Sequence, residues 1–283
     1  MRLPNFIIIG AMKAGTTTLY DQMRRQPGLY LPALKEPNFF SDDSHYVRGI
    51  EWYSRLFASA HSDDLIGEAS THYTKLPTYP CTVARMRMVL KNPRFIYVMR
   101  HPIDRLVSQY IHQWSQGEIT CDLEEAIKRH PELVHYSCYA LQLKPYVEAF
   151  GMKAILPIFF ERMLSDPGGT FSRIWQFIGY KPAPESSVRL ESCNASKERV
   201  RRFPFYDLLI NSRVASGLRR TFVPKSLRDA VRQQLTMERR PELCVDTRRR
   251  LELLFNKDLA LLGDWLDHPI SCQNFHPPKI SRE

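Results

Sequence analysis

The sequence predicts an α/β fold in three layers, in which helices cover both faces of a central and mainly parallel sheet. Three observations predict it. Short apolar runs rich in β-branched residues alternate with segments of helical spacing, the first run leads through a loop of small residues into a helix, and the last third of the chain reads as helical. This alternation is typical of parallel strands that are joined by crossover helices.

Five runs are expected to form strands, in chain order 5–9, 29–31, 65–67, 94–99 and 154–160. The expected helices follow in the same order, at 17–23, 82–91, 102–114, 122–130, 137–150, 205–219, 225–238 and 246–266. Pro102 suits the first turn of its helix, because the N–H that proline lacks has no helical partner there. Residues 191–204 are expected to form a polar loop, and the strand at 154–160 is expected despite Pro157.

The chain of 283 residues is long enough to bury a large core. We expect one domain over residues 1–283, with its core at 4–266 and an irregular tail at 267–283. No run approaches the ~20 consecutive apolar residues of a membrane span, so no span is expected. The sequence enters its first strand directly, which leaves no room for a signal peptide, and we therefore expect a cytoplasmic protein.

Positive charge is concentrated in one part of the chain. The formal net charge is +10, and residues 195–250 contain 15 Lys and Arg against six Asp and Glu. A surplus of this size predicts an anionic ligand near this segment, although many of these side chains are expected to be solvated.

The cysteines indicate neither a disulfide framework nor a metal centre. They lie far apart, and the sequence has no C-x-x-C pair and no cluster of His and Cys at metal-ligand spacing. We expect buried free thiols and no metal site.

A phosphate-binding loop is predicted where the first strand meets the first helix. This segment reads Gly10-Ala11-Met12-Lys13-Ala14-Gly15-Thr16-Thr17-Thr18. Small residues allow successive backbone N–H groups to face an anion, and the helix that begins there adds the positive end of its dipole. The segment departs from the nucleoside-triphosphate pattern G-x-x-x-x-G-K-[ST], because Thr16 follows Gly15 and the lysine is at position 13.

A second anion contact is predicted at the end of the strand at 94–99. Arg100 follows that strand directly, and Ser108 lies eight residues further along, within the helix that Pro102 opens. In an open parallel sheet the ligand crevice lies at the carboxyl ends of the strands, so Arg100 is expected beside the loop at 13–18. Both segments are therefore expected to contact one nucleotide.

These motifs resemble those of the sulfotransferases that use 3′-phosphoadenosine 5′-phosphosulfate (PAPS), in particular the carbohydrate and heparan types, here as a soluble member of bacterial kind. The family has a P-loop-like α/β fold with a helical C-terminal part. The resemblance implies that Lys13 contacts the oxygen that bridges sulfate and phosphate, and that Arg100 and Ser108 bind the 3′-phosphate. It assigns the 5′-phosphate to Ala14, Gly15, Thr16, Thr17 and Thr18. A segment that closes over the nucleotide is matched by Arg199, Val200, Arg201 and Arg202, with valine where glycine is usual.

The same resemblance assigns a catalytic base. Lys35-Glu36-Pro37-Asn38-Phe39-Phe40 is similar to a Lys-Glu-x-x-Phe-Phe segment in which the glutamate takes the proton of the acceptor. Glu36 is then the base, and Lys35, His72 and His112 are candidates for binding the acceptor. Ala69 stands where heparan-type members commonly have lysine, which argues against that subgroup.

The implied function is transfer of a sulfuryl group from PAPS to a hydroxyl or amine of a glycan, lipid or small natural product. Adenosine 3′,5′-bisphosphate (PAP) is the product, no metal is required, and no nucleic acid partner is expected. Two alternatives stay open: a P-loop nucleotide or adenylylsulfate kinase, and a non-catalytic protein that binds an anionic polymer. The sequence identifies neither the acceptor nor the oligomeric state.

Overall fold

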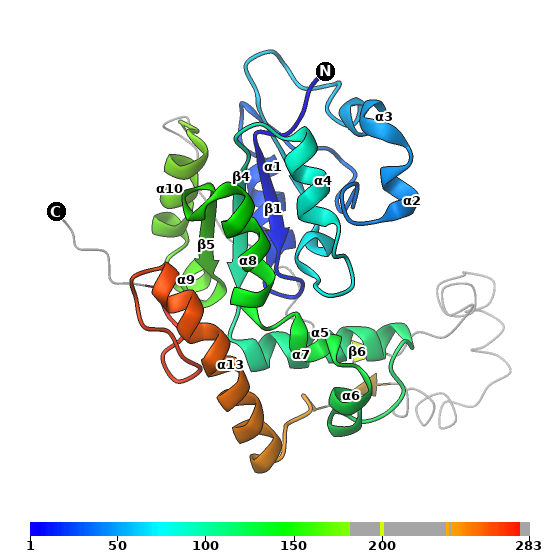
Figure 1. The fold of residues 1–283 in the computed structure, drawn as a ribbon, viewed down its shortest axis with the longest axis vertical. Coiled ribbons are helices and arrows are strands. Elements are labelled where there is room, and N and C mark those ends of the chain that lie inside the picture. Colours follow the sequence, from blue (N-terminus) through cyan, green and yellow to red (C-terminus); the bar gives the residue numbers. More distant parts are fainter. Residues whose placement is uncertain (182–198, 201–235, 238, 278–283) are drawn as a thin grey trace, which may run out of the picture.

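The computed structural model of the protein describes residues 1–181, 199–200, 236–237 and 239–277. Its centre is a parallel sheet of five strands in the order β2-β3-β1-β4-β5 (Figure 1). The strands are β1 (Phe6–Gly10), β2 (Leu29–Tyr30), β3 (Leu65–Ala69), β4 (Arg94–Met99) and β5 (Ile155–Phe159). Every predicted strand is present, with bounds that differ by at most two residues at either end.

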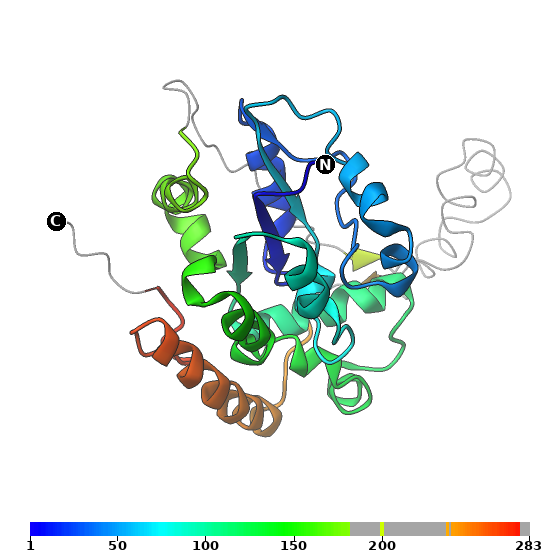
Figure 2. The same ribbon diagram turned by 45° about the horizontal axis from the view of Figure 1, so that its top comes forward.

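Helices cover both faces of this sheet. In Figures 1 and 2, α4 and α8 lie on one face, whereas α1 and α10 lie on the other. The described α-helices are α1 (Thr16–Arg24), α2 (Asp43–Tyr46), α3 (Gly49–Arg55), α4 (Thr82–Val89), α5 (Pro102–Gln116), α6 (Leu123–Arg129), α7 (Glu132–His135), α8 (Tyr139–Phe150), α9 (Phe160–Ser165), α10 (Pro167–Ile178) and α13 (Val245–Trp265). Two short 3₁₀ helices, η1 (Thr71–Thr74) and η2 (Met152–Ala154), precede α4 and β5. The predicted α/β class with a parallel sheet is confirmed.

The proline in the last strand is explained by its position in the sheet. β5 is an edge strand that pairs only with β4, where Pro157 lies opposite Tyr97. An edge strand has one side without a ladder partner, so a residue without an N–H is tolerated there.

The prediction for the basic segment was partly wrong. Thr236–Met237 was expected to end a helix, but it forms β7, which pairs antiparallel with β6 (Arg199–Val200) inside the expected polar loop. Helical periodicity cannot reveal a pairing between segments more than 30 residues apart. The expected helix at 205–219 and the remainder of that at 225–238 lie outside the described residues.

The irregular segment after α13 contributes to the core. Residues 267–277 contain no regular element, yet Ile270 and Cys272 are buried against the rest of the molecule. The carbonyl oxygen of Cys272 lies 3.0 Å from Nε2 of His101, which precedes α5. This contact fastens the segment beside the carboxyl end of β4.

The five described cysteines are all free, and the expectation of burial holds for only some of them. Cys138 and Cys272 are buried, whereas Cys81 and Cys244 are exposed.

Among the described residues, none of the helices is both long and apolar enough to cross a bilayer.

Candidate active site

The loop after β1 has the geometry of an anion cradle. Lys13 and Gly15 both adopt left-handed backbone conformations, with φ of 68° and 87°, and the Ala11 N–H donates to the carbonyl oxygen of Val98 in β4 at 2.7 Å. Among the described side chains none caps α1, so the first N–H groups of this helix have no capping acceptor. Alternating backbone conformations and a helix N-terminus together direct N–H groups toward an anion.

A single ring connects this loop with the end of β4. A Cβ atom at Gly15 would lie 2.6 Å from the ring of Phe160, so only glycine fits there. The guanidinium of Arg100 lies 5.3 Å from the centre of the same ring, within the range of a cation–π contact. The ring of Phe160 therefore lies between the predicted 5′- and 3′-phosphate contacts. Sequence analysis missed it, because it begins a helix that was not predicted.

Helix α5 places Ser108 and His112 one turn apart and also contains a buried cation. Arg105 is fully buried, and burial lowers the pKa of its guanidinium. Its nitrogens donate to Ser137 Oγ at 2.6 Å, to the Leu133 carbonyl at 2.7 Å, to Gln109 Oε1 at 2.8 Å and, weakly, to the Met12 carbonyl at 3.5 Å. No carboxylate among the described residues pairs with it, so a positive charge remains beside the phosphate loop.

The predicted base lies at the phosphate loop. Lys35 Nζ donates to Thr17 Oγ1 at 2.9 Å and also lies 3.3 Å from Glu36 Oε1. Glu36 Oε2 accepts from the N–H of Thr71 at 2.6 Å and from its hydroxyl at 3.1 Å. The side chains of Lys35 and Glu36 are 22% and 30% exposed, so a ligand can reach both of them.

Residues at the end of β3 hold the backbone on either side of this carboxylate by hydrogen bonds. Glu36 and Asn38 both adopt left-handed conformations, with φ of 59° and 51°. The Glu36 N–H donates to the Ala69 carbonyl at 2.9 Å, and the Asn38 N–H donates to Ser70 Oγ at 3.0 Å. Left-handed backbone at non-glycine residues persists only where the surroundings enforce it.

Further polar groups lie near Glu36, and of those described here sequence analysis identified only His72. His72 Nδ1 lies 3.3 Å from Asp42 Oδ1, its ring stacks on Tyr79 with centres 4.7 Å apart, and burial lowers its pKa. Burial also lowers the pKa of Lys75 to about 8, although the nearby carboxylate of Glu36 opposes this shift. Asp42 and Lys75 were missed, since neither belongs to a motif with a recognisable spacing.

Part of the predicted nucleotide-closing segment lies beside the site. β6, which contains Arg199 and Val200, lies against α5, whereas Arg201 and Arg202 fall outside the described residues. Shortly after β7, Arg240 Nη2 lies 2.6 Å from Asp104 Oδ1 on the first turn of α5. The segment that contains β6 and β7 thus lies near the helix that contains Ser108.

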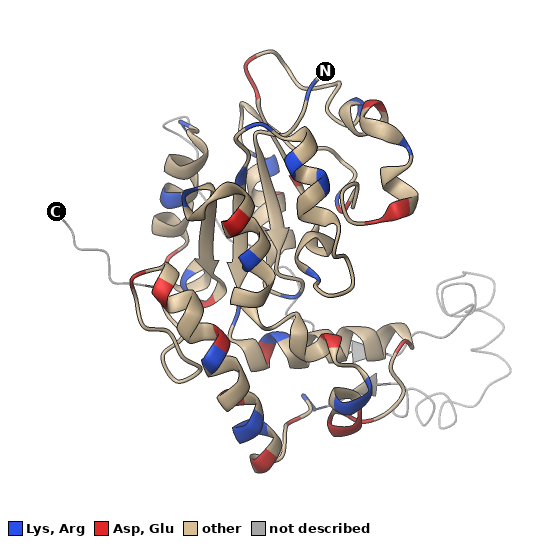
Figure 3. Cartoon of the chain, in the orientation of Figure 1, with Lys and Arg blue, Asp and Glu red and all other residues tan. Residues whose placement is uncertain are grey.

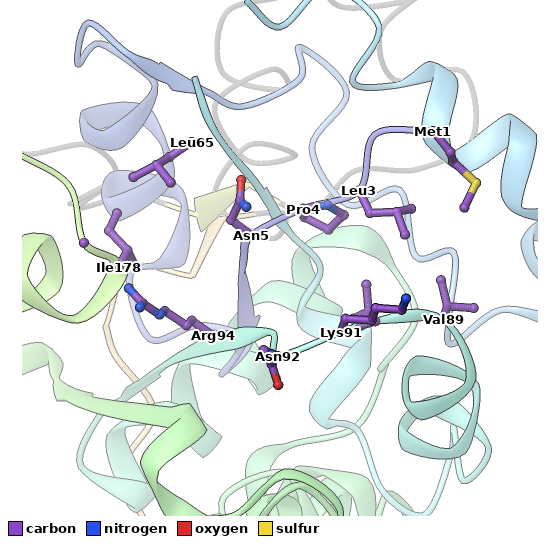
Figure 4. Close-up of a pocket in the computed structure, with 12 residues that line it drawn as sticks. Met1, Leu3, Pro4, Asn5, Leu65, Val89, Lys91, Asn92, Arg94 and Ile178 are labelled. Atoms are coloured by element: carbon purple, nitrogen blue, oxygen red, sulfur yellow. The ribbon is translucent and has the colours of Figure 1, made fainter. Parts of the chain in front are cut away.

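Charge and cavity shape alone do not reveal this site. Lys, Arg, Asp and Glu are interspersed over the described elements, including α13 (Figure 3). A hollow of about 570 Å³ lies at the opposite, amino-terminal edge of the sheet, between Leu3, Val89 and Ile178 (Figure 4). Ligands of open parallel sheets bind at the carboxyl ends of the strands, so that edge and not this hollow is the candidate site. Among the described residues, no group of three His, Cys, Asp or Glu side chains is arranged to hold a metal ion.

Comparisons with known proteins agree with this geometry. The chain matches the family described as "Sulfotransferase domain" over residues 3–263. It is 35% identical over 158 residues to the membrane-associated sulfotransferase kil1 of Dictyostelium discoideum, covering 52% of this chain and 32% of that protein. It is 29% identical over 189 residues to heparan sulfate glucosamine 3-O-sulfotransferase 3B1 of Mus musculus, covering 64% of this chain and 47% of that protein. These alignments span less than half the length of the two relatives.

A solved structure shows the same fold. The crystal structure of a sulfotransferase from Alicyclobacillus acidocaldarius has a TM-score of 0.69 to this chain at 22% identity, covering 95% of this chain and 98% of the other. The predicted resemblance in fold is confirmed.

The buried carboxyl of Glu68 predicts how stability depends on pH. Glu68 in β3 is fully buried, and burial raises its pKa from 4.5 to about 7, although hydroxyl groups of Tyr53, Tyr73 and Ser70 oppose this shift and Glu36 adds to it. The folded state therefore retains this proton at pH values where the unfolded chain releases it. The free energy of unfolding is expected to fall as pH rises from about 4.5 through 7, by up to about 3 kcal/mol from this group.

Denaturant unfolding between pH 5 and 8 measures this effect. Glu68→Gln removes the titration, so wild type is expected to lose stability relative to this variant as pH rises. A stability difference that is the same at every pH would contradict the assignment.

Proposed function

Because the chain belongs to the sulfotransferase family, we propose that it transfers a sulfuryl group from PAPS to a hydroxyl or amine of an acceptor and releases PAP. The observation that carries this proposal is the position of Lys35, which contacts both Thr17 of the phosphate loop and the carboxylate of Glu36. A donor anion in the loop and an acceptor at Glu36 would meet at this lysine.

In the proposed donor complex, residues at two strand ends hold the two ends of the nucleotide. Backbone N–H groups of residues 14–18 hold the 5′-phosphosulfate, whereas Arg100 and Ser108 hold the 3′-phosphate, assisted by the segment 199–202. The cation–π contact of Arg100 with Phe160 supports this arrangement, because it orients the guanidinium before the donor binds.

The proposed reaction is an in-line displacement at sulfur. The acceptor oxygen or nitrogen forms a bond to sulfur while its proton passes to Glu36, and the bond between sulfur and the bridging oxygen breaks. That oxygen keeps the electron pair and leaves as part of PAP. Lys13 and the loop N–H groups then stabilise the growing negative charge more strongly than they stabilise the ground state.

The two alternatives explain fewer of the observations. A kinase of the P-loop class needs a lysine after the second glycine and an aspartate at a strand end for Mg²⁺, but here Thr16 follows Gly15 and Arg100 follows β4. A polymer-binding protein would not require Glu36 to be fixed beside the phosphate loop. For the acceptor, the heparan sulfate relative supports saccharides as the first class to test.

Substituting the base tests the acceptor half of the proposal. Glu36→Gln is expected to lower kcat by roughly two orders of magnitude, the effect of losing a general base, while the Kd for PAP stays within about twofold. Transfer of labelled sulfate from PAPS to a panel of saccharides, lipids and small hydroxyl compounds gives kcat, and calorimetry gives Kd. Glu148→Gln is the matched control, since this glutamate is exposed and pairs with Lys144 at 3.8 Å. Unchanged turnover in Glu36→Gln would remove this residue from its role.

Substituting one loop glycine tests the donor half. Gly15→Ala places a methyl group against Phe160 and strains a φ of 87°, so PAP affinity is expected to fall at least tenfold. Gly49→Ala is the control, because Gly49 has a similar φ of 80° but open space around it. Calorimetry with PAP, and separately with ATP and magnesium, compares the variants with wild type. Uptake of ATP with magnesium but not of PAP would contradict the proposal and favour the kinase alternative.

A further inference from the structure

A buried hydroxyl network surrounds Glu68, immediately behind the loop that holds Glu36. Glu68 Oε1 accepts from the hydroxyl groups of Tyr53 at 2.7 Å and Tyr73 at 2.8 Å. Its Oε2 accepts from Ser70 Oγ at 2.9 Å. Glu68 and Ser70 are both 0% exposed, so no water competes for these bonds. A buried carboxyl with three donors is costly to maintain and serves no step of the proposed reaction directly.

The direction of these bonds determines whether the hydroxyl oxygens can accept hydrogen bonds from N–H groups of the loop. A serine hydroxyl has one hydrogen, and in Ser70 that hydrogen is given to Glu68 when this carboxyl is ionised, above its pKa of about 7. The lone pairs of Ser70 Oγ are then free to accept from the Asn38 N–H, at 3.0 Å. Tyr73 repeats this arrangement more weakly, since its hydroxyl donates to Glu68 and accepts from the Phe40 N–H at 3.5 Å.

We propose that Glu68 is a positioning residue for the base, which fixes the loop of Glu36 by keeping Ser70 and Tyr73 oriented as acceptors. This inference rests on the proposed role of Glu36. The Asn38 N–H is held through Ser70, and the carboxylate of Glu36 is held by the neighbouring Thr71. The left-handed backbone of Glu36 needs such restraint, whereas Asn38 adopts the same conformation at lower cost. A loss of about 1 Å in placement is enough to lower a catalytic rate by roughly two orders of magnitude.

Three substitutions separate this role from ordinary burial. Ser70→Ala removes the acceptor of Asn38 and is expected to lower kcat about tenfold or more, with the Kd for PAP within about twofold of wild type. Glu68→Gln is expected to do the same, because the amide leaves at least one of the three hydroxyl groups without its acceptor. Tyr53→Phe is the matched control: it also removes a bond to Glu68, but the Tyr53 hydroxyl contacts no loop N–H. Its kcat is expected to stay within about twofold of wild type.

A double-mutant cycle distinguishes positioning of the base from a merely structural role, because only positioning makes the losses of kcat non-additive. If Glu68 and Ser70 act through the base, adding Ser70→Ala to Glu36→Gln lowers the residual turnover no further. Equal fold-losses in the two backgrounds would overturn the proposal, as would wild-type kcat in both Ser70→Ala and Glu68→Gln. A loss of PAP affinity that matches the loss of kcat would overturn it too, because the damage would then extend beyond the base.

The design also separates this inference from the proposed function. If Glu36→Gln is fully active, the proposed function fails first. If Glu36→Gln is inactive while Ser70→Ala is fully active, only the role of Glu68 fails. If Glu68→Gln does not fold, Ser70→Ala alone decides, because it leaves the carboxyl with two of its three donors.

Discussion

The candidate site depends on the parallel pairing of β1 with β3 on one side and β4 on the other. β1 lies between these two neighbours and runs parallel to both, so the loops that follow all three strands meet at one edge of the sheet. Side-chain and backbone bonds then join them: Thr74 Oγ1 donates to the Ile9 carbonyl at 2.6 Å, and the Ala11 N–H donates to the Val98 carbonyl. Residues that are distant in sequence thereby share one small region.

Two buried ionisable groups flank β1 at this edge, and neither has an oppositely charged partner among the described residues. Glu68 is held by hydroxyl groups, whereas Arg105 is held by a hydroxyl, an amide and carbonyl oxygens. Hydrogen bonds of this kind keep a buried ionisable group in place without an oppositely charged partner, and burial raises the pKa of the Glu68 carboxyl to about 7. Arg105 reaches the Met12 carbonyl of the loop at 10–18, whereas Glu68 bonds to Ser70, which in turn accepts from the loop of Glu36.

Sequence patterns were sufficient for features that are local in the chain. The strands, the loop at 10–18, the position of Arg100 and the segment at 35–40 all follow from periodicity or from a contiguous motif. Features that depend on distant pairing were missed. The sequence around Glu68 does not reveal its bond to the Tyr53 hydroxyl, because Tyr53 belongs to a helix that was not predicted. No local pattern indicates that Phe160 lies against Gly15. The strand at Thr236–Met237 was misread for the same reason.

Left-handed backbone conformations are concentrated at one edge of the sheet. Five non-glycine residues in the described part of the chain have a positive φ, and three of them, Lys13, Glu36 and Asn38, belong to the loops at the carboxyl edge. Only Asn92 borders the large hollow at the amino edge. Strain of this kind is costly and persists only where surrounding contacts enforce it, and here those contacts come from β3 and from the loop itself. The occurrence of all three residues at or beside the loop of residues 10–18 supports the proposal that places the reaction at this edge.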